Sequence, residues 1–231
     1  MPGLPARHVP AVIRADGAAG TQWRSDLWIS NLSPSEGSFR VSWLPRDGIG
    51  VGRTLTLAAG ASRNFEDVLA SLFGAEAGTG QLRIETDLPA WNASSRAWTP
   101  GGGGTYGQWM PALADAASTA AGEGRLAIPQ LTHDRAFRTN IGITEIAGLP
   151  AGARLRVADA AGKEIWSTSI ALAPGEQRQL GLAALGAPEF SNGYAWVEPE
   201  GNGRIVAYGS VVDNVSGDPI YVPAVHPSAD P

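Results

Sequence analysis

Hydrophobic and polar residues alternate along much of this chain. One face of segment 23–29 carries Trp23, Ser25, Leu27 and Ile29. The opposite face carries Arg24, Asp26, Trp28 and Ser30. A period of two is typical of a half-buried antiparallel strand. The same alternation recurs in the segments 39–43, 82–84, 137–144, 155–157 and 205–207. The pattern therefore predicts an all-β chain.

The chain also contains an internal repeat. Residues 23–29 align with 137–143, 57–63 with 172–178, 80–85 with 193–198, and 111–112 with 223–224. Four matches in the same order, at nearly constant offset, indicate two copies of one module, against the alternative of two unrelated all-β halves. We expect a first domain at 1–113 and a second at 125–231. Residues 114–124 lack a bulky apolar side chain, which is typical of a linker.

Turn and helix signals divide each half. Turns are predicted at 47–48, 161–162 and 202–203, the last as a type I′ hairpin, and the glycines at 101–104 predict a hairpin tip. One short helical crossover is expected in each half, at 64–74 with Asn64 as N-cap and at 182–186. The Val-Pro-Ala-Val copies at 9–12 and 222–225 predict extended edge segments rather than core strands, because proline cannot donate a ladder hydrogen bond.

About seven short strands and one crossover in roughly 100 residues predict an immunoglobulin-like antiparallel β-sandwich in each half, with a barrel as the alternative. Several segments resemble a group of tandem β-rich modules: 9–12, 21–31, 66–74, 103–108 and 217–224. Such modules occur in secreted or surface-attached bacterial proteins, often as appendages of long multidomain chains. The resemblance implies an extracellular or cell-surface, non-catalytic role. It rests on turns and core positions and identifies no site.

Charge and composition narrow the function classes. The 231 residues include 17 basic and 22 acidic side chains, for a net charge of −5. Nucleic-acid-binding proteins usually carry a basic surplus, so we do not expect nucleic acid as a partner. The absence of cysteine excludes disulfides, thiolate metal sites and a cysteine nucleophile. The first residues lack the apolar region of a signal peptide, and no stretch of 18 apolar residues occurs, so we expect neither a leader nor a membrane span in this chain.

Catalytic and cofactor motifs are sparse. The sequence has no Gly-x-Ser-x-Gly and no His-Glu-x-x-His motif, and the glycine run at 101–104 lacks the lysine of a phosphate-binding loop. No cofactor is therefore expected. A serine–histidine–aspartate site assembled in space from Ser94 or Ser95 stays open.

The loop 213–218 is a weak candidate for calcium. It collects oxygen donors around a glycine, and the candidate ligands are Asp213, Asn214 and Asp218. Asx residues and glycine also close hairpins without a metal, and this is the alternative interpretation.

The tryptophans are distributed unequally, with six of the eight in the first half. Trp23 and Trp43 align with apolar residues of the second half and are expected in the core. Trp28 aligns with a glycine and shares its face with polar residues, and two further tryptophans flank the glycine loop. Indole faces can stack on sugar rings or contact a partner's apolar surface. The candidate ligand-binding residues are Trp28, Trp98, Trp109, Arg24 and Asp26.

These observations predict a non-catalytic, extracellular structural or binding module with a glycan or another surface protein as partner. Two alternatives stay open. One is a carbohydrate-binding module that uses the exposed tryptophans. The other is a hydrolase with a site at the interdomain cleft, where pockets often form.

Overall fold

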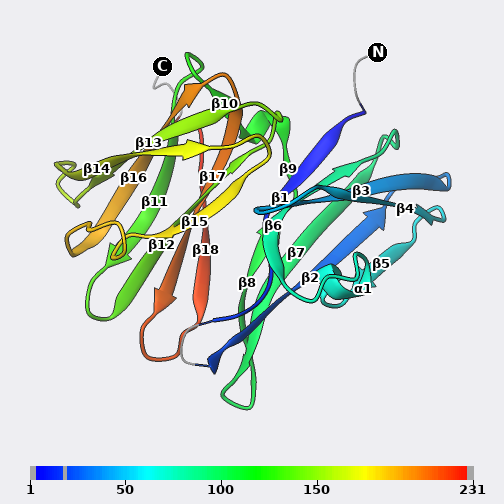
Figure 1. The fold of residues 1–231 in the computed structure, drawn as a ribbon, viewed down its shortest axis with the longest axis horizontal. Helices are drawn as coiled ribbons and strands as arrows, with labels where there is room; N and C mark the ends of the chain where they lie inside the picture. Colours follow the sequence, from blue (N-terminus) through cyan, green and yellow to red (C-terminus); the bar gives the residue numbers. More distant parts are fainter. Residues whose placement is uncertain (1–3, 18–19, 228–231) are drawn as a thin grey trace. The chain divides into compact units, whose positions relative to one another are not determined.

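The computed structural model describes residues 4–17 and 20–227 (Figure 1). The chain divides into two compact units, Met1–Asp115 and Ala116–Pro231. Both units consist almost entirely of antiparallel strands, which confirms the all-β prediction. Within the described ranges, no helix is long and apolar enough to cross a membrane.

Two sets of hydrogen-bonded strands build unit 1. The main strands are β1 (Ala6–Asp16), β2 (Gln22–Asn31), β3 (Gly37–Pro45), β4 (Val51–Leu57), β5 (Ser62–Phe65), β6 (Gly78–Glu85), β7 (Trp91–Gly101) and β8 (Gly104–Pro111). They pair in the orders β4-β3-β6-β1 and β5-β2-β7-β8. Strand β1 joins the two sets, because its end pairs with β2 at Ala15 and Asp16. The short β9 (Leu113–Ala114) adds to the start of β1.

The core of unit 1 comes from the apolar face of each strand. Its fully buried members include Val9, Leu27, Ile29, Phe39, Val41, Leu82 and Ile84. Burial of each such side chain stabilises the folded state by about 1.5–3 kcal/mol. Trp91 is buried beside Phe39 and meets its ring edge-on at 5.8 Å.

The predicted crossovers contain less helix than expected. Helix α1 covers only Val68–Ser71, and Asn64, the expected N-cap, belongs to β5. Asp67 occupies the N-cap position instead, with φ 44 in the left-handed region and no capping bond from its side chain. In unit 2, residues 182–186 form a hydrogen-bonded turn, closed by a bond from the Ala187 N–H to the Leu182 carbonyl.

Unit 2 repeats this arrangement. Its main strands are β11 (Leu126–His133), β12 (Phe137–Glu145), β13 (Ala151–Ala158), β14 (Glu164–Leu172), β15 (Gln177–Gly181), β16 (Phe190–Gly201), β17 (Arg204–Asp213) and β18 (Pro219–Pro223). The segment expected to be a linker contains the 3₁₀ helix η2 (Asp115–Ala117) and strand β10 (Thr119–Ala120), which pairs with β17.

The strand orders show the repeat directly. Unit 2 has the orders β14-β13-β16-β11 and β15-β12-β17-β18, which match those of unit 1 strand for strand. Each aligned sequence segment falls on the equivalent strand or turn. In each unit the first main strand lies beside the sixth, and in unit 1 the end of the first strand also pairs with the second.

Two local predictions need correction. Residues 9–12 and 222–225 pair on one side at each bonded position, as an edge segment does, but Val9, Val12 and Val222 are buried in the cores. The turn at 202–203 connects β16 and β17, which lie in different sheets, so it is no hairpin. The type of hairpin expected there occurs at Gly102 and Gly103, which both have positive φ between β7 and β8.

Candidate functional site

Strand register brings the three candidate tryptophans onto one face of the β5-β2-β7-β8 sheet. On β2 and β7, Arg24 lies opposite Trp98, and Trp28 lies opposite Ser94. On β7 and β8, Arg96 lies opposite Trp109. Directly opposed residues of antiparallel strands share a face. We call this surface the tryptophan face; its members are Arg24, Asp26, Trp28, Arg96, Trp98 and Trp109.

The exposure of the indoles increases toward the sheet edge. Trp109, on the edge strand β8, is 56% exposed, whereas Trp28 and Trp98 are half-buried. Gly107 lies opposite Trp98, and a Cβ at that position would come within 2.8 Å of the Trp98 Cβ. Glycine at 107 therefore lets the chain pass closely beside the indole.

Arg96 is the central polar group of the tryptophan face, and no sequence pattern singled it out. It lies between Asp26 on β2 and Trp109 on β8. Its Nη2 donates to the Thr105 hydroxyl at 2.8 Å and to the Thr105 carbonyl at 3.3 Å, near the hairpin tip. Its remaining N–H groups are suited to bind the hydroxyl oxygens of a ligand lying across the strands.

Asp26 and Arg24 have a structural task that the sequence did not predict. Asp26 is 9% exposed, and its carboxylate accepts a hydrogen bond from the backbone N–H of Asp67 at 2.8 Å. Burial raises the pKa of Asp26, while Trp98 and Arg96 act in the opposite direction. The Asp67 carboxylate pairs with Arg14 and Arg24. These two candidates therefore hold the segment before α1 against the sheet.

The tryptophans expected in the core behave differently from each other. Trp43 is buried and packs near Phe73, with ring centroids 6.0 Å apart. Trp23 is half-buried, so the expectation of full burial is wrong. It lies on β2 directly opposite Ala15 of β1, near the point where the two strands turn, and this position leaves part of the ring exposed.

The loop 213–218 uses its oxygen atoms to close the turn between β17 and β18. One carboxylate oxygen of Asp213 accepts the N–H groups of Val215 and Ser216, and these bonds hold the pKa of Asp213 below its usual range. The side-chain amide oxygen of Asn214 accepts a hydrogen bond from the Arg138 guanidinium, which is a cation. Among the described residues, no group of three or more acidic, histidine or cysteine side chains could hold a metal ion.

A serine, a histidine and an aspartate do meet at the start of unit 2, but not in a catalytic order. The Ser191 hydroxyl donates directly to Asp134 at 2.8 Å. His133 is buried, and its ring lies against Phe190 with centroids 6.4 Å apart. A nucleophilic triad needs the histidine between the hydroxyl and the carboxylate. Asp134 instead accepts the N–H groups of Ala136 and Phe137 and stabilises the turn before β12.

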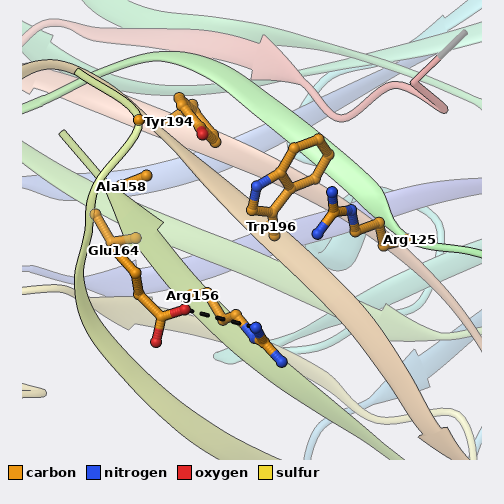
Figure 2. Close-up of a pocket in the computed structure, with 8 residues that line it drawn as sticks. Arg125, Arg156, Ala158, Glu164, Tyr194 and Trp196 are labelled. Atoms are coloured by element: carbon orange, nitrogen blue, oxygen red, sulfur yellow. Dashed lines mark ion pairs between the residues drawn. The ribbon is translucent and has the colours of Figure 1, made fainter. Parts of the chain in front are cut away.

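A pocket that was not predicted lies on the outer face of the β14-β13-β16-β11 sheet of unit 2. It has a volume of about 130 Å³ and is lined by residues of β13, β14 and β16 and of the segments beside them (Figure 2). We call it the Trp196 pocket; it is lined by Arg125, Arg156, Val157, Ala158, Gly162, Glu164, Tyr194 and Trp196. The sequence signal was present in β16, where Tyr194 and Trp196 alternate with apolar residues.

Comparison with known proteins gives little further information. No protein family matches the chain, and no curated protein is significantly similar to it. A crystal structure of Thermotoga maritima 1070 is similar over 49% of this chain and 97% of its own, with 15% identity and a TM-score of 0.39. The PBSX exported protein XepA matches over 90% of this chain and 81% of its own, with 11% identity and a TM-score of 0.28. Likenesses this weak carry no argument about function.

Proposed function

We propose that this chain is a non-catalytic, extracellular binding module and that the tryptophan face of unit 1 binds glycan chains. The observation that carries the proposal is the register of β2, β7 and β8, which gathers three indoles from three strands onto one face. Trp109 does not contribute to the core of unit 1, because its side chain is mostly exposed.

The dimensions of the tryptophan face suit an extended ligand. Trp28 and Trp109 lie two strands apart, which corresponds to about 10 Å across the sheet. Trp98 lies four residues along β7 from the position opposite Trp28, or roughly 13 Å. Such a surface is long enough for several sugar rings laid side by side. The apolar faces of the rings would contact the indoles, and their hydroxyl groups would reach Arg96 and the Thr105 hydroxyl.

Another surface protein is the second candidate partner, because exposed indoles also contact apolar protein surfaces. The arrangement favours a glycan for one reason. The indoles alternate with charged groups at the spacing of the strands, whereas the centre of a protein interface is depleted of charged residues.

The test is retention of the full chain by soluble polysaccharides in affinity gel electrophoresis. The panel consists of xylan, a mixed-linkage β-glucan, galactomannan and pullulan. We expect at least one to retard the protein, and the Trp109→Ala variant to bind it at least about tenfold more weakly, a loss equivalent to roughly 1.4 kcal/mol.

Leu32→Ala is the matched control, since Leu32 is a similarly exposed apolar residue of unit 1 outside the tryptophan face. Both substitutions should change the free energy of unfolding by no more than about 0.5 kcal/mol. Wild-type affinity in Trp109→Ala would overturn the assignment of this face. If no polysaccharide retards the wild-type chain while a surface protein is bound through Trp109, the partner is a protein and the glycan proposal is wrong.

A further inference from the structure

We infer that the Trp196 pocket of unit 2 is a second binding site, which takes a single uncharged sugar ring. This site lies on a different sheet of a different unit from the tryptophan face, and the inference does not depend on that face. Three features support it: the shape of the pocket, its charge balance, and the comparison with the repeat.

Small residues create the hollow. On the outer face of the sheet, Ala158 of β13 lies opposite Tyr194, and Arg156 of the same strand lies opposite Trp196. Gly162, in the turn between β13 and β14, borders the same space, and a Cβ there would lie 3.6 Å from the Tyr194 hydroxyl. The Tyr194 ring therefore stands between small residues that do not fill the space around it. At about 130 Å³ the pocket is well below the 300–1,000 Å³ of typical drug-sized sites, so it fits one ring and not an oligomer.

The aromatic wall is held in place. The Arg125 guanidinium lies 3.6 Å from the centre of the Trp196 ring, and Tyr194 meets the same ring edge-on at 5.5 Å. Figure 2 shows Tyr194 and Trp196 side by side, with Arg125 beyond the indole. The cation covers one face of the indole, so a ligand ring would lie against Tyr194 and the edge of Trp196. A sugar ring can place its C–H groups there.

The charges of the site balance. Arg156 bridges two carboxylates, with Nη2 at 3.1 Å from Glu198 and Nη1 at 3.5 Å from Glu164. Arg125 lies 3.7 Å from Glu198. Two of the three ion pairs are longer than a hydrogen bond, so a hydroxyl group can enter, accept from a guanidinium and donate to a carboxylate. A charged ligand would have to break these pairs, whereas a neutral polyol would bridge them.

The repeat shows that the fold does not require these aromatic residues. The positions of Tyr194 and Trp196 correspond to Gln81 and Arg83 in unit 1, on the equivalent strand β6. Unit 1 thus builds the same strand order with polar side chains at both positions. The aromatic pair is consequently an addition of unit 2 that the sheet itself does not explain.

The experiment uses the full chain and methyl glycosides of glucose, galactose and mannose as probes. The readout is the indole N–H resonance of Trp196 in ¹H–¹⁵N spectra, assigned with the Trp196→Arg variant. At least one glycoside should shift this resonance saturably with a dissociation constant in the millimolar range, below about 100 mM. Glucuronate should bind more weakly than methyl glucoside, because it is charged.

Tyr194→Gln places at position 194 the residue that unit 1 carries, and should weaken binding at least tenfold while the other indole resonances stay in place. Trp109→Ala should leave glycoside binding unchanged, which separates this site from the tryptophan face. The inference is overturned if no glycoside shifts the Trp196 resonance, or if Tyr194→Gln binds like the wild type. Tighter binding of glucuronate would refute the neutral ligand class. Loss of glycoside binding in Trp109→Ala would place the sugar on the tryptophan face instead.

Discussion

Replacing Glu145 by alanine would remove the acceptor that ties three segments of unit 2 together. Glu145 ends β12 and is fully buried. One carboxylate oxygen accepts the N–H groups of Ala147 and Arg204, at 2.7 and 3.3 Å. The other accepts those of Gly148 and Gly175, both at 2.8 Å. The side chain thereby fixes the loop after β12, the turn between β14 and β15, and the start of β17.

The magnitude follows from these bonds. A hydrogen bond to a charged group contributes about 1.5–3 kcal/mol net, so the three short bonds set an upper range of roughly 4.5–9 kcal/mol. The N–H groups of Ala147 and Gly148 lie in an exposed loop and can turn to water once the carboxylate is gone. We therefore expect Glu145→Ala to lower the free energy of unfolding of unit 2 by about 3–5 kcal/mol. This is a large fraction of the roughly 5–15 kcal/mol that a domain of this size has in total.

Glu145→Gln makes the test sharper. Each carboxylate oxygen accepts two N–H groups, so whichever way the amide is turned, one pair of donors faces an NH₂ group. The glutamine variant should lose about 2 kcal/mol or more.

Urea denaturation of the full chain, followed by peptide-resolved hydrogen exchange over 145–148 and 172–178, measures the loss in unit 2. Glu189→Ala, at an exposed glutamate of the same unit, is the control. A loss below about 1 kcal/mol in Glu145→Ala, or wild-type stability in Glu145→Gln, would refute the reasoning.

Three further substitutions test other parts of the structure. Burial lowers the pKa of His8 below its ordinary value of 6.5, so the unfolded chain binds the proton better than the folded one. The melting temperature of unit 1 should therefore fall as the pH falls below about 6.5, and His8→Gln should make it less dependent on pH. Burial raises the pKa of Asp26, so ionisation of this carboxyl lowers the stability of the fold as the pH rises above 3.8. In urea denaturation at pH 7, Asp26→Asn should therefore be as stable as the wild type or up to about 1 kcal/mol more stable. The amide oxygen can still accept the backbone N–H of Asp67, and unit 2 has Asn140 at the equivalent position. A Cβ added at Gly142 would collide with the buried Tyr208 ring, so Gly142→Ala should cost about 1–3 kcal/mol in the same assay, and a neutral effect would contradict the packing.

The strands could be predicted from the sequence because alternation is a local property. The tryptophan face was only half predictable for the same reason. The outward direction of Trp28 follows from the alternation in β2 alone. That Trp98 and Trp109 lie on the same face depends on the register of β7 and β8. The structural task of Asp26 depends on Asp67, which lies 41 residues further along the chain.

The errors have the same origin. The turn at 202–203 has hairpin chemistry, yet its flanking strands belong to different sheets, and only tertiary pairing decides that. Asn64 carries a helix-capping side chain, but pairing of β5 with β2 takes it into a strand. The Trp196 pocket was missed because its partners come from distant strands. Tyr194 and Trp196 alternate visibly on β16, whereas Arg156 and Glu164 join them only when the sheet forms.

The two units keep the same framework while their surfaces differ, and one position shows how. In unit 1, Trp28 of β2 lies opposite Ser94 of β7. At the equivalent position in unit 2, Gly142 of β12 lies opposite Tyr208 of β17. One large and one small side chain thus occupy the same place in both sheets, but the strands have exchanged them. A pair of this kind preserves the volume on the sheet face while it changes which strand presents the ring. Because Trp28 is half-buried whereas Tyr208 is fully buried, the same sheet face carries a partly exposed ring in unit 1 and a buried one in unit 2 without any change in strand order.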